Sequence, residues 1–142
     1  MRMKEIRIMA MLLLLFSLAV PVQSTSAASK NVKIKVTLVS AELTENNHVG
    51  NEWYTVANAN GKEIAEGDSV VLTLKSTDSV KLTAYAEEQD KIPDSASEAA
   101  SVKVSNITKT TTKALKVTVV ENRGRYSGNT ATWKFTFSLK KQ

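Results

Sequence analysis

The stretch "TWKFTFSLK", residues 132–140, decides the fold class of this protein. Its apolar residues Trp133, Phe135, Phe137 and Leu139 alternate with polar ones, and a period of two places all four side chains on one face of an extended strand. An amphipathic helix would instead repeat apolar residues at spacings of three and four. The segment therefore predicts a β-strand with one buried face and one solvent face.

Most of the chain after residue 31 shows the same alternation, and no stretch keeps a helical pattern for three turns. The further alternating segments lie at 32–43, 53–59, 62–66, 70–74, 80–86, 102–107 and 115–119. Turn-forming residues separate them at intervals of roughly 8–12 residues. We predict an all-β fold, an antiparallel β-sandwich of about eight strands that is C2-like or immunoglobulin-like. A β-barrel is the alternative.

Two local features refine this prediction. The dipeptide Asn60-Gly61 lies between "WYTVANA" and "KEIAE", and both of its residues tolerate the positive φ of a type I′ hairpin turn. In the first strand the apolar phase slips by one residue between Leu38 and Val39, which indicates a β-bulge.

The N-terminus has the features of a secretory signal peptide. Three basic residues precede an apolar run at 8–20 that is too short to span a bilayer, and the small residues "STSAAS" follow. We expect cleavage after Ala28, or after Ala27, so that 1–28 is a removed leader and 29–142 a single secreted domain. An uncleaved membrane anchor is the alternative.

Composition narrows the function classes. The chain has 19 Lys and Arg against 14 Asp and Glu, a net charge of +5, and the leader contains three of the basic residues and one of the acidic ones. The remaining excess is small, and no basic stripe is interleaved with stacking aromatic residues, so we expect no nucleic-acid binding. The absence of cysteine excludes disulfides and a thiol nucleophile.

No enzyme signature is present. His48 is the only histidine, which excludes a zinc site with several imidazoles, and no nucleophile motif accompanies it. We interpret it as a surface loop residue. Glu87, Glu88 and Asp90 would be the acid and base of a hydrolase. Such a pair needs separated pKa values, and so polar a loop offers little desolvation to separate them. We therefore expect a protein that is not an enzyme.

The segment "AEEQDKIPDSASE", residues 86–98, contains five carboxylates and one lysine. Strand parity places Glu88 and Asp90 on the inward side, and Asp94 and Glu98 follow on the returning chain. Calcium takes 6 to 8 oxygen ligands in flexible geometry, so these four carboxylates are a candidate calcium site, and calcium is the one cofactor we consider. The alternative is a solvated loop, because Asp, Glu and Ser are ordinary in exposed connections.

Successive connections of an antiparallel sandwich alternate between its two ends. This count places four segments at one end: 44–51, 66–68, 88–100 and 122–129. There Arg123, Arg125 and Tyr126 form a cationic and aromatic tip, and Asn46 and Asn47 add polar groups. We predict that this end binds a protein or an anionic cell-surface ligand by charge-assisted hydrogen bonds. The alternative is that Arg123 only pairs with acidic groups nearby.

Three stretches, "NNHVGNEW", "NGKEI" and "EEQDKIPD", resemble in their order the small secreted bacterial β-sandwich modules that are C2-like in outline. The resemblance covers roughly residues 31–105. It implies a calcium site in loops at one end, followed by contact with membranes or proteins, and the positions that carry over are Glu88, Asp90 and Asp94. The sequence departs from the pattern because its first loop has no aspartate and one aspartate of the usual pair is a glutamate.

These observations predict a secreted, monomeric, non-catalytic binding module without a transmembrane segment in its mature form. In one version of this hypothesis, calcium orders the acidic segment. The alternative function is a secreted enzyme inhibitor or immunity-type protein. Such a protein would insert the segment 88–100 into a cleft, with Pro93 stiffening it.

Overall fold

The computed structural model describes residues 29–142, and the predicted leader lies outside them. The strands are β1 (Asn31–Asn46), β2 (Trp53–Ala59), β3 (Lys62–Glu63), β4 (Ser69–Lys75), β5 (Ser79–Glu88), β6 (Asp94–Lys103), β7 (Thr110–Val120) and β8 (Thr130–Lys141). Two short 3-10 helices, η1 (Val104–Asn106) and η2 (Gly124–Tyr126), lie in connections. No helix in this part of the chain is long and apolar enough to cross a membrane.

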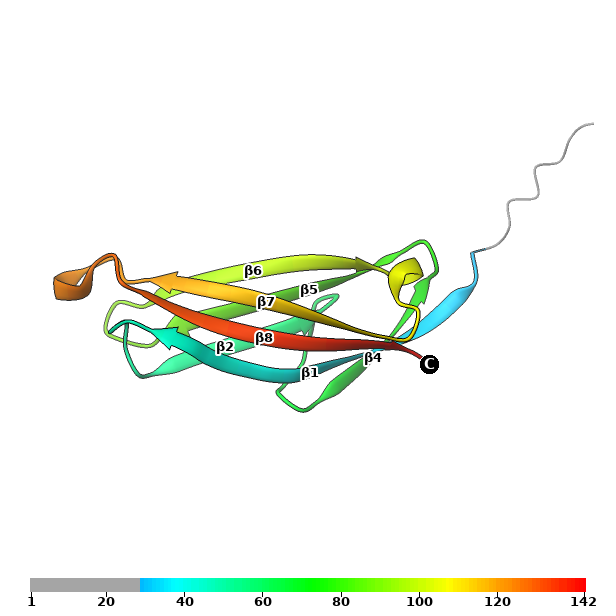
Figure 1. Cartoon of the computed structure of the whole chain (residues 1–142), viewed down its shortest axis with the longest axis horizontal. Helices are drawn as coiled ribbons and strands as arrows, with labels where there is room; N and C mark the ends of the chain where they lie inside the picture. Colours follow the sequence, from blue (N-terminus) through cyan, green and yellow to red (C-terminus); the bar gives the residue numbers. More distant parts are fainter. Residues whose placement is uncertain (1–28) are drawn as a thin grey trace, which may run out of the picture.

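The strands form two antiparallel sheets of four strands each (Figure 1). The first sheet has the order β4-β1-β8-β7, and the second has the order β3-β2-β5-β6. Buried residues of both sheets belong to one hydrophobic cluster between them. The predicted all-β sandwich of eight strands is confirmed, and the sheets do not close into the alternative barrel.

The alternation in β8 has the predicted consequence. Phe135, Phe137 and Leu139 are fully buried, and β8 pairs with β1 on one side and with β7 on the other, so its apolar face fills the centre of the first sheet. The second sheet contributes several small buried residues to the same cluster, namely Ala57, Ala59, Ala84 and Ala86. Small residues on one inner face leave room for large ones on the other at native packing density.

The hairpin and the bulge are both present. Asn60 (φ 48°) and Gly61 (φ 77°) adopt the positive φ angles of a type I′ turn. Between Leu38 and Ser40 the register of β1 against β8 shifts, and the unpaired Val39 is half exposed. A second shift between Leu43 and Glu45 was not predicted.

The acidic segment is shorter as a loop than predicted. β5 ends at Glu88 and β6 begins at Asp94, so the connection consists of residues 89–93, and most of the predicted loop 88–100 is strand. Of the strand predicted at 102–107, Val102 and Lys103 are strand, as the end of β6, and the rest of the prediction is wrong because η1 follows there. The reason is that β6 lies at a sheet edge, where a strand needs few large apolar residues.

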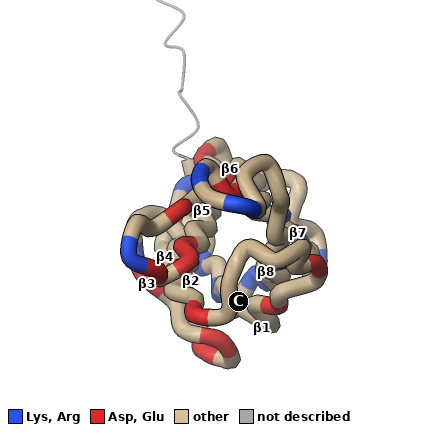
Figure 2. Tube along the Cα trace, turned by 90° about the vertical axis from the view of Figure 1, so that its left-hand side faces the viewer, with Lys and Arg blue, Asp and Glu red and all other residues tan. Residues whose placement is uncertain are grey.

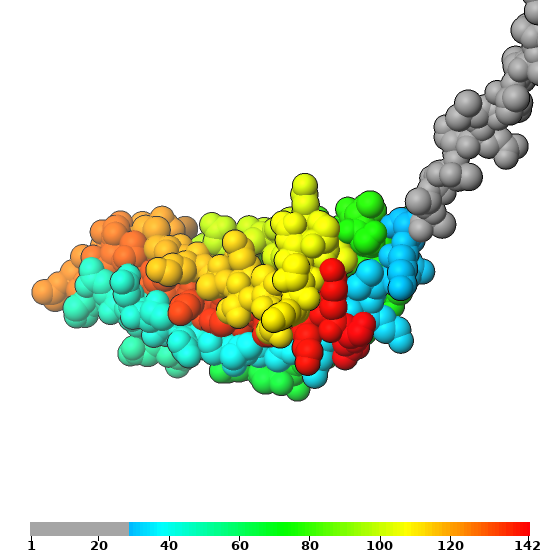
Figure 3. All heavy atoms as spheres, turned by 45° about the vertical axis from the view of Figure 1, so that its right-hand side comes forward, coloured from blue at the N-terminus to red at the C-terminus, as the bar shows by residue number. Residues whose placement is uncertain are grey.

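Three of the four connections assigned to one end do lie together. Residues 47–52, 89–93 and 121–129 connect the strands at what we call the loop end (Figure 1), and the first residues of β1 and the last of β8 lie at the opposite end (Figure 3). The turn at 66–68 does not belong to the loop end. β3 has only two residues, so the chain crosses to the first sheet at mid-length, and β4 begins opposite Thr37.

The two sides of the sandwich differ. On one side the edge strands β6 and β7 pack against each other. On the other side β4 pairs with β1 only as far as Thr37, and β3 pairs with β2 only at Asn58 and Ala59. Within residues 29–142, residues 39–46 of β1 and 53–56 of β2 therefore have a strand partner on one side only. We call these two unpaired edges, with the space between them, the open side.

We expect Phe137→Ala to lower the free energy of unfolding by about 3–5 kcal/mol, because it leaves a cavity in the centre of the core. Thr136→Ala changes the neighbouring residue on the opposite face of β8 and should cost no more than about 0.5 kcal/mol. Urea denaturation of both variants measures the difference. Equal losses would contradict the assignment of the buried face.

Candidate functional site

The loop at 47–52 is held by one side chain. The Asn46 carboxamide accepts a hydrogen bond from the Val49 N–H (3.0 Å) and donates one to the Gly50 carbonyl (2.6 Å), while the Val49 side chain is buried in the core. The predicted ligand-binding residue Asn46 thus holds its own loop. Asn47 contacts the ring of the next residue, with its Oδ1 atom 3.2 Å from His48 Nδ1.

The loops at 47–52 and 121–129 meet through an aromatic stack. The ring centroids of His48 and Tyr126 are 5.2 Å apart at an interplanar angle of 15°, and the Arg125 guanidinium lies 5.8 Å from the Tyr126 centroid. All three residues are exposed. A hollow of about 350 Å³ lies beside this stack, lined by Asn46, His48, Gly50 and Asn51.

The residues predicted at this tip are therefore partly brought together. Arg125 and Tyr126 lie in one cluster, and Arg123, two residues before Arg125, donates its backbone N–H to the Glu121 carboxylate (3.3 Å). His48, which we interpreted as a surface loop residue, is exposed in the loop at 47–52 and is also part of the cluster. No sequence signal identifies this contact, because it depends on the conformations of two loops from distant parts of the chain.

Asp94 joins the two edge strands at the loop end. Its carboxylate accepts hydrogen bonds from the Asn122 side chain (2.6 Å) and from the Asn122 backbone N–H (3.2 Å). The side-chain hydrogen bond from Asn122 is the main cause that lowers the pKa of Asp94, and the charge of Arg123 contributes least. The donors of the neighbouring loop thus already engage this carboxylate.

Glu88, the strand partner of Asp94, has the opposite environment. Only 5% of its surface is exposed, and its side chain lies against the backbone of Gly50. Burial is the largest cause that raises the pKa of Glu88, followed by the charge of Asp90. Strand parity therefore placed Glu88 on the correct side, but the carboxyl group is covered by the first loop.

The four predicted calcium ligands do not form one ligand set. The Asp90 carboxylate accepts the Ile92 N–H (2.6 Å), and Glu98 lies further along β6, exposed and opposite Ala84. Among residues 29–142, no group of three or more His, Cys, Asp or Glu side chains is arranged to hold a metal ion. Calcium binding stays a prediction.

Adjacent carboxylates in β5 face opposite ways. Glu87 accepts hydrogen bonds from the Tyr85 hydroxyl and from the Gln89 side chain (2.8 Å). The hydrogen bond between Tyr85 and Glu87 is the main cause that raises the pKa of Tyr85. Glu88 instead points into the molecule. Glu87 and Glu88 therefore lie on opposite faces of the strand, whereas an acid and base pair would have to reach the same substrate.

No protein-family model matches this chain, and no curated protein matches it in sequence. The resemblance to C2-like modules therefore rests on the quoted residues alone, and the function has to be argued from the geometry of the site.

We expect Glu88→Gln to raise the melting temperature at about pH 7, because burial disfavours the ionised form of Glu88 in the folded state and glutamine has no charge to desolvate. The pKa of Glu88 is raised in the folded state, so its contribution to stability is full below the unfolded pKa and is lost as the pH rises through the folded pKa. The gain should therefore disappear at about pH 3, where both residues are neutral.

Circular dichroism melts at both pH values measure this effect, and Glu98→Gln, at an exposed position, is the control. The Asp94 contribution, which is lost as the pH falls, is common to all variants and cancels in the comparison. A Glu88→Gln melting temperature at neutral pH no higher than wild type would contradict the expectation.

We expect Gly50→Ala to destabilise the protein more than Gly128→Ala. Both glycines have positive φ (138° and 91°), which costs a substituted residue about 1–3 kcal/mol, but only at Gly50 would the new methyl group overlap a side chain, that of Glu88. The double variant Gly50→Ala/Glu88→Ala should recover part of the loss in urea denaturation. No recovery would show that Glu88 does not cover Gly50.

Proposed function

We propose that this protein is a secreted, non-catalytic binding module whose loop end recognises an anionic ligand on a cell surface or a partner protein. The observation that carries the proposal is the exposed stack of His48, Tyr126 and Arg125, which joins two loops on a rigid sandwich. The features of the first 28 residues support secretion.

The chemistry of the stack suits an anionic group attached to a flat or apolar unit. A guanidinium offers a planar set of donors to a carboxylate or phosphate, and Arg125 is exposed to solvent. The Tyr126 ring, 42% exposed, offers a face for stacking next to that charge. The amide groups of Asn46 and Asn51 in the adjacent hollow supply further polar contacts.

The second candidate is an enzyme inhibitor or immunity-type protein that inserts the β5–β6 connection into a cleft. The observation in its favour is Ile92, a large apolar side chain that is 48% exposed in the connection and precedes Pro93. This hypothesis uses residues 89–93 rather than the stack.

We expect the protein to bind inorganic polyphosphate with a dissociation constant that rises with salt, and Arg123→Glu/Arg125→Glu to weaken this binding at least tenfold. The matched control is Lys35→Glu/Lys140→Glu, which makes the same change in net charge at an exposed cross-strand pair on the outer face of the first sheet. Fluorescence anisotropy with labelled polyphosphate measures both variants.

Tyr126→Ala separates stacking from charge, because it removes the ring and leaves the net charge unchanged. We expect it to weaken binding several-fold. The proposal is wrong if both charge-reversed pairs lose affinity equally, because binding would then follow net charge alone.

Figure 2 views the molecule from the loop end and shows that acidic and basic residues both lie around its rim. The position of a charge therefore has to be tested as well as the net charge.

A further inference from the structure

The open side has the features of a vacant strand position. β4 pairs with β1 along residues 31–37, and beyond this point residues 39–46 continue as a sheet edge, with β8 as their only strand partner in the described part of the chain. An unpaired edge presents a row of backbone N–H and C=O groups to any segment that lies beside it. A further strand placed here would extend the first sheet in line with β4.

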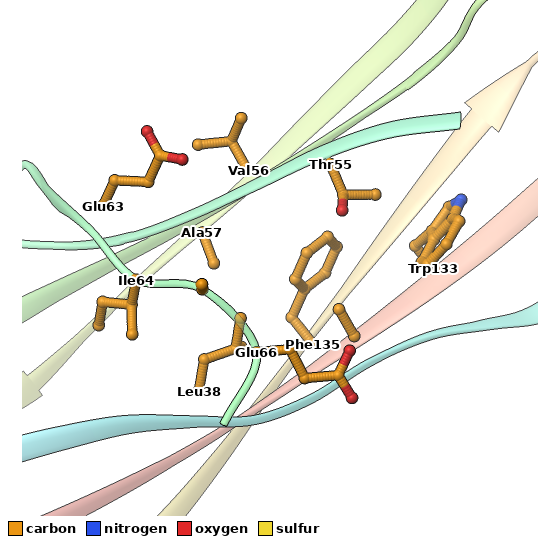
Figure 4. Close-up of a pocket in the computed structure, with 11 residues that line it drawn as sticks. Leu38, Thr55, Val56, Ala57, Glu63, Ile64, Glu66, Trp133 and Phe135 are labelled. Atoms are coloured by element: carbon orange, nitrogen blue, oxygen red, sulfur yellow. The ribbon is translucent and has the colours of Figure 1, made fainter. Parts of the chain in front are cut away.

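A groove leads from this edge into the space between the sheets. It has a volume of about 340 Å³, and its buried lining includes Leu38, Ala57, Ile64 and Phe135. Figure 4 shows the residues that line it, which come from β1, β2, β3, β8 and the segment between β3 and β4, with the carboxylates of Glu63 and Glu66 among them. Buried apolar side chains thus contribute to the lining of the groove, together with the exposed acidic residues Glu63 and Glu66.

Two further observations show groups in this region that have polar or apolar contacts left unmade within residues 29–142. The Trp133 Nε1 atom is buried without a hydrogen-bond partner in the described part of the chain, although buried polar atoms usually have one. Val39, Leu43 and Tyr54, on the strands that flank the groove, are exposed large apolar residues.

Charge indicates what could cover it. No Lys or Arg occurs between residues 36 and 61, whereas Glu42, Glu45 and Glu52 do occur there and are exposed. On the outer face of β1, Glu42 has Lys134 as its β8 partner and has no partner on the unpaired edge. A strand added at this edge would bring its own outward side chains beside Glu42 and Glu45.

A second copy of the same edge is a poor occupant. Pairing residues 39–46 with themselves would bring the glutamates of two copies together, and like charges across strands are destabilising. A partner strand with basic outward residues would gain from the same positions, and its apolar inward residues would enter the groove.

We propose that the open side binds an extended peptide segment of alternating apolar and basic residues, which adds as a strand to residues 39–46 of β1 and places its apolar side chains in the groove. This surface overlaps the hollow beside the stack at Asn46, but the two proposals use different ligands and different variants, so that the failure of one leaves the other standing.

The probe is the synthetic peptide acetyl-KVKVKVKVK-amide. The chain has two tryptophans, Trp53 and Trp133, whose rings meet edge to face at 5.8 Å beside the groove, so their intrinsic fluorescence reports its occupancy. We expect a saturable change with a dissociation constant of about 1–100 μM. The acidic peptide acetyl-EVEVEVEVE-amide should bind at least about tenfold more weakly, because its glutamates would lie beside Glu42 and Glu45. The interrupted peptide acetyl-KVKVPVKVK-amide should also bind at least about tenfold more weakly, because proline removes a backbone N–H from the strand pairing.

Hydrogen exchange locates the bound peptide. Amides within residues 39–46 should gain protection, because only strand addition gives them partners. Glu42→Lys should weaken binding at least about tenfold, whereas Glu98→Lys, the same change at an exposed position on the opposite side, should not. Arg123→Glu/Arg125→Glu should leave peptide binding unweakened.

Three results would overturn the proposal: no fluorescence change at about 1 mM peptide, equal binding of the proline-interrupted peptide, or protection confined to the loop end. The second result would show that charge and apolarity alone attract the peptide. The third would show that the cationic peptide binds the carboxylates near Glu88 instead.

Discussion

The two backbone hydrogen bonds between Leu38 and the turn at Gly67 and Asp68 determine how the two sheets are joined. Gly67 N–H donates to the Leu38 carbonyl (2.8 Å), and Leu38 N–H donates to the Asp68 carbonyl (3.2 Å). They fix the point at which the chain crosses from the second sheet to the first and begins β4. The bulge at Val39 follows directly, where β1 loses this partner. Bulges commonly occur where a strand pairing ends, and here the bulge marks the start of the open side.

The loop end shows how one pair of carboxylates can acquire different properties. Glu88 and Asp94 are strand partners, yet Asp94 accepts two hydrogen bonds from Asn122, whereas Glu88 lies against Gly50 and is desolvated. Hydrogen bonding favours the charged form of one, and burial disfavours that of the other. The difference arises mainly from the loop that covers each residue, and the charge of Asp90 in the acidic segment adds to the raised pKa of Glu88.

The features that could be predicted from the sequence are those with a strong local signal. Alternation in β8 and the positive φ of Asn60 and Gly61 follow from side-chain chemistry alone. The extent of β6 was missed because its run of Ala, Ser and Glu has little contrast between faces, which an edge strand does not need. The position of the turn at 66–68 was missed because a count of alternating ends treats the two-residue strand β3 as a full one. Contacts between loops, such as that of His48 with Tyr126, depend on tertiary structure and have no local signal.

Besides Asn46, which belongs to both proposed surfaces, Trp53 connects them. Its indole N–H donates to the Gly50 carbonyl in the first loop (3.4 Å), and its ring meets Trp133 beside the groove. His48, two residues before Gly50, carries the stack at the loop end. A strand bound at the open side would therefore contact a residue that is hydrogen-bonded to the loop of the other surface. Contact alone does not couple two sites. Coupling requires two conformations of the protein for which both ligands have different affinities. The Asn46 hydrogen bonds and the buried Val49 side chain hold this loop in one conformation, which favours two independently acting surfaces on one rigid sandwich.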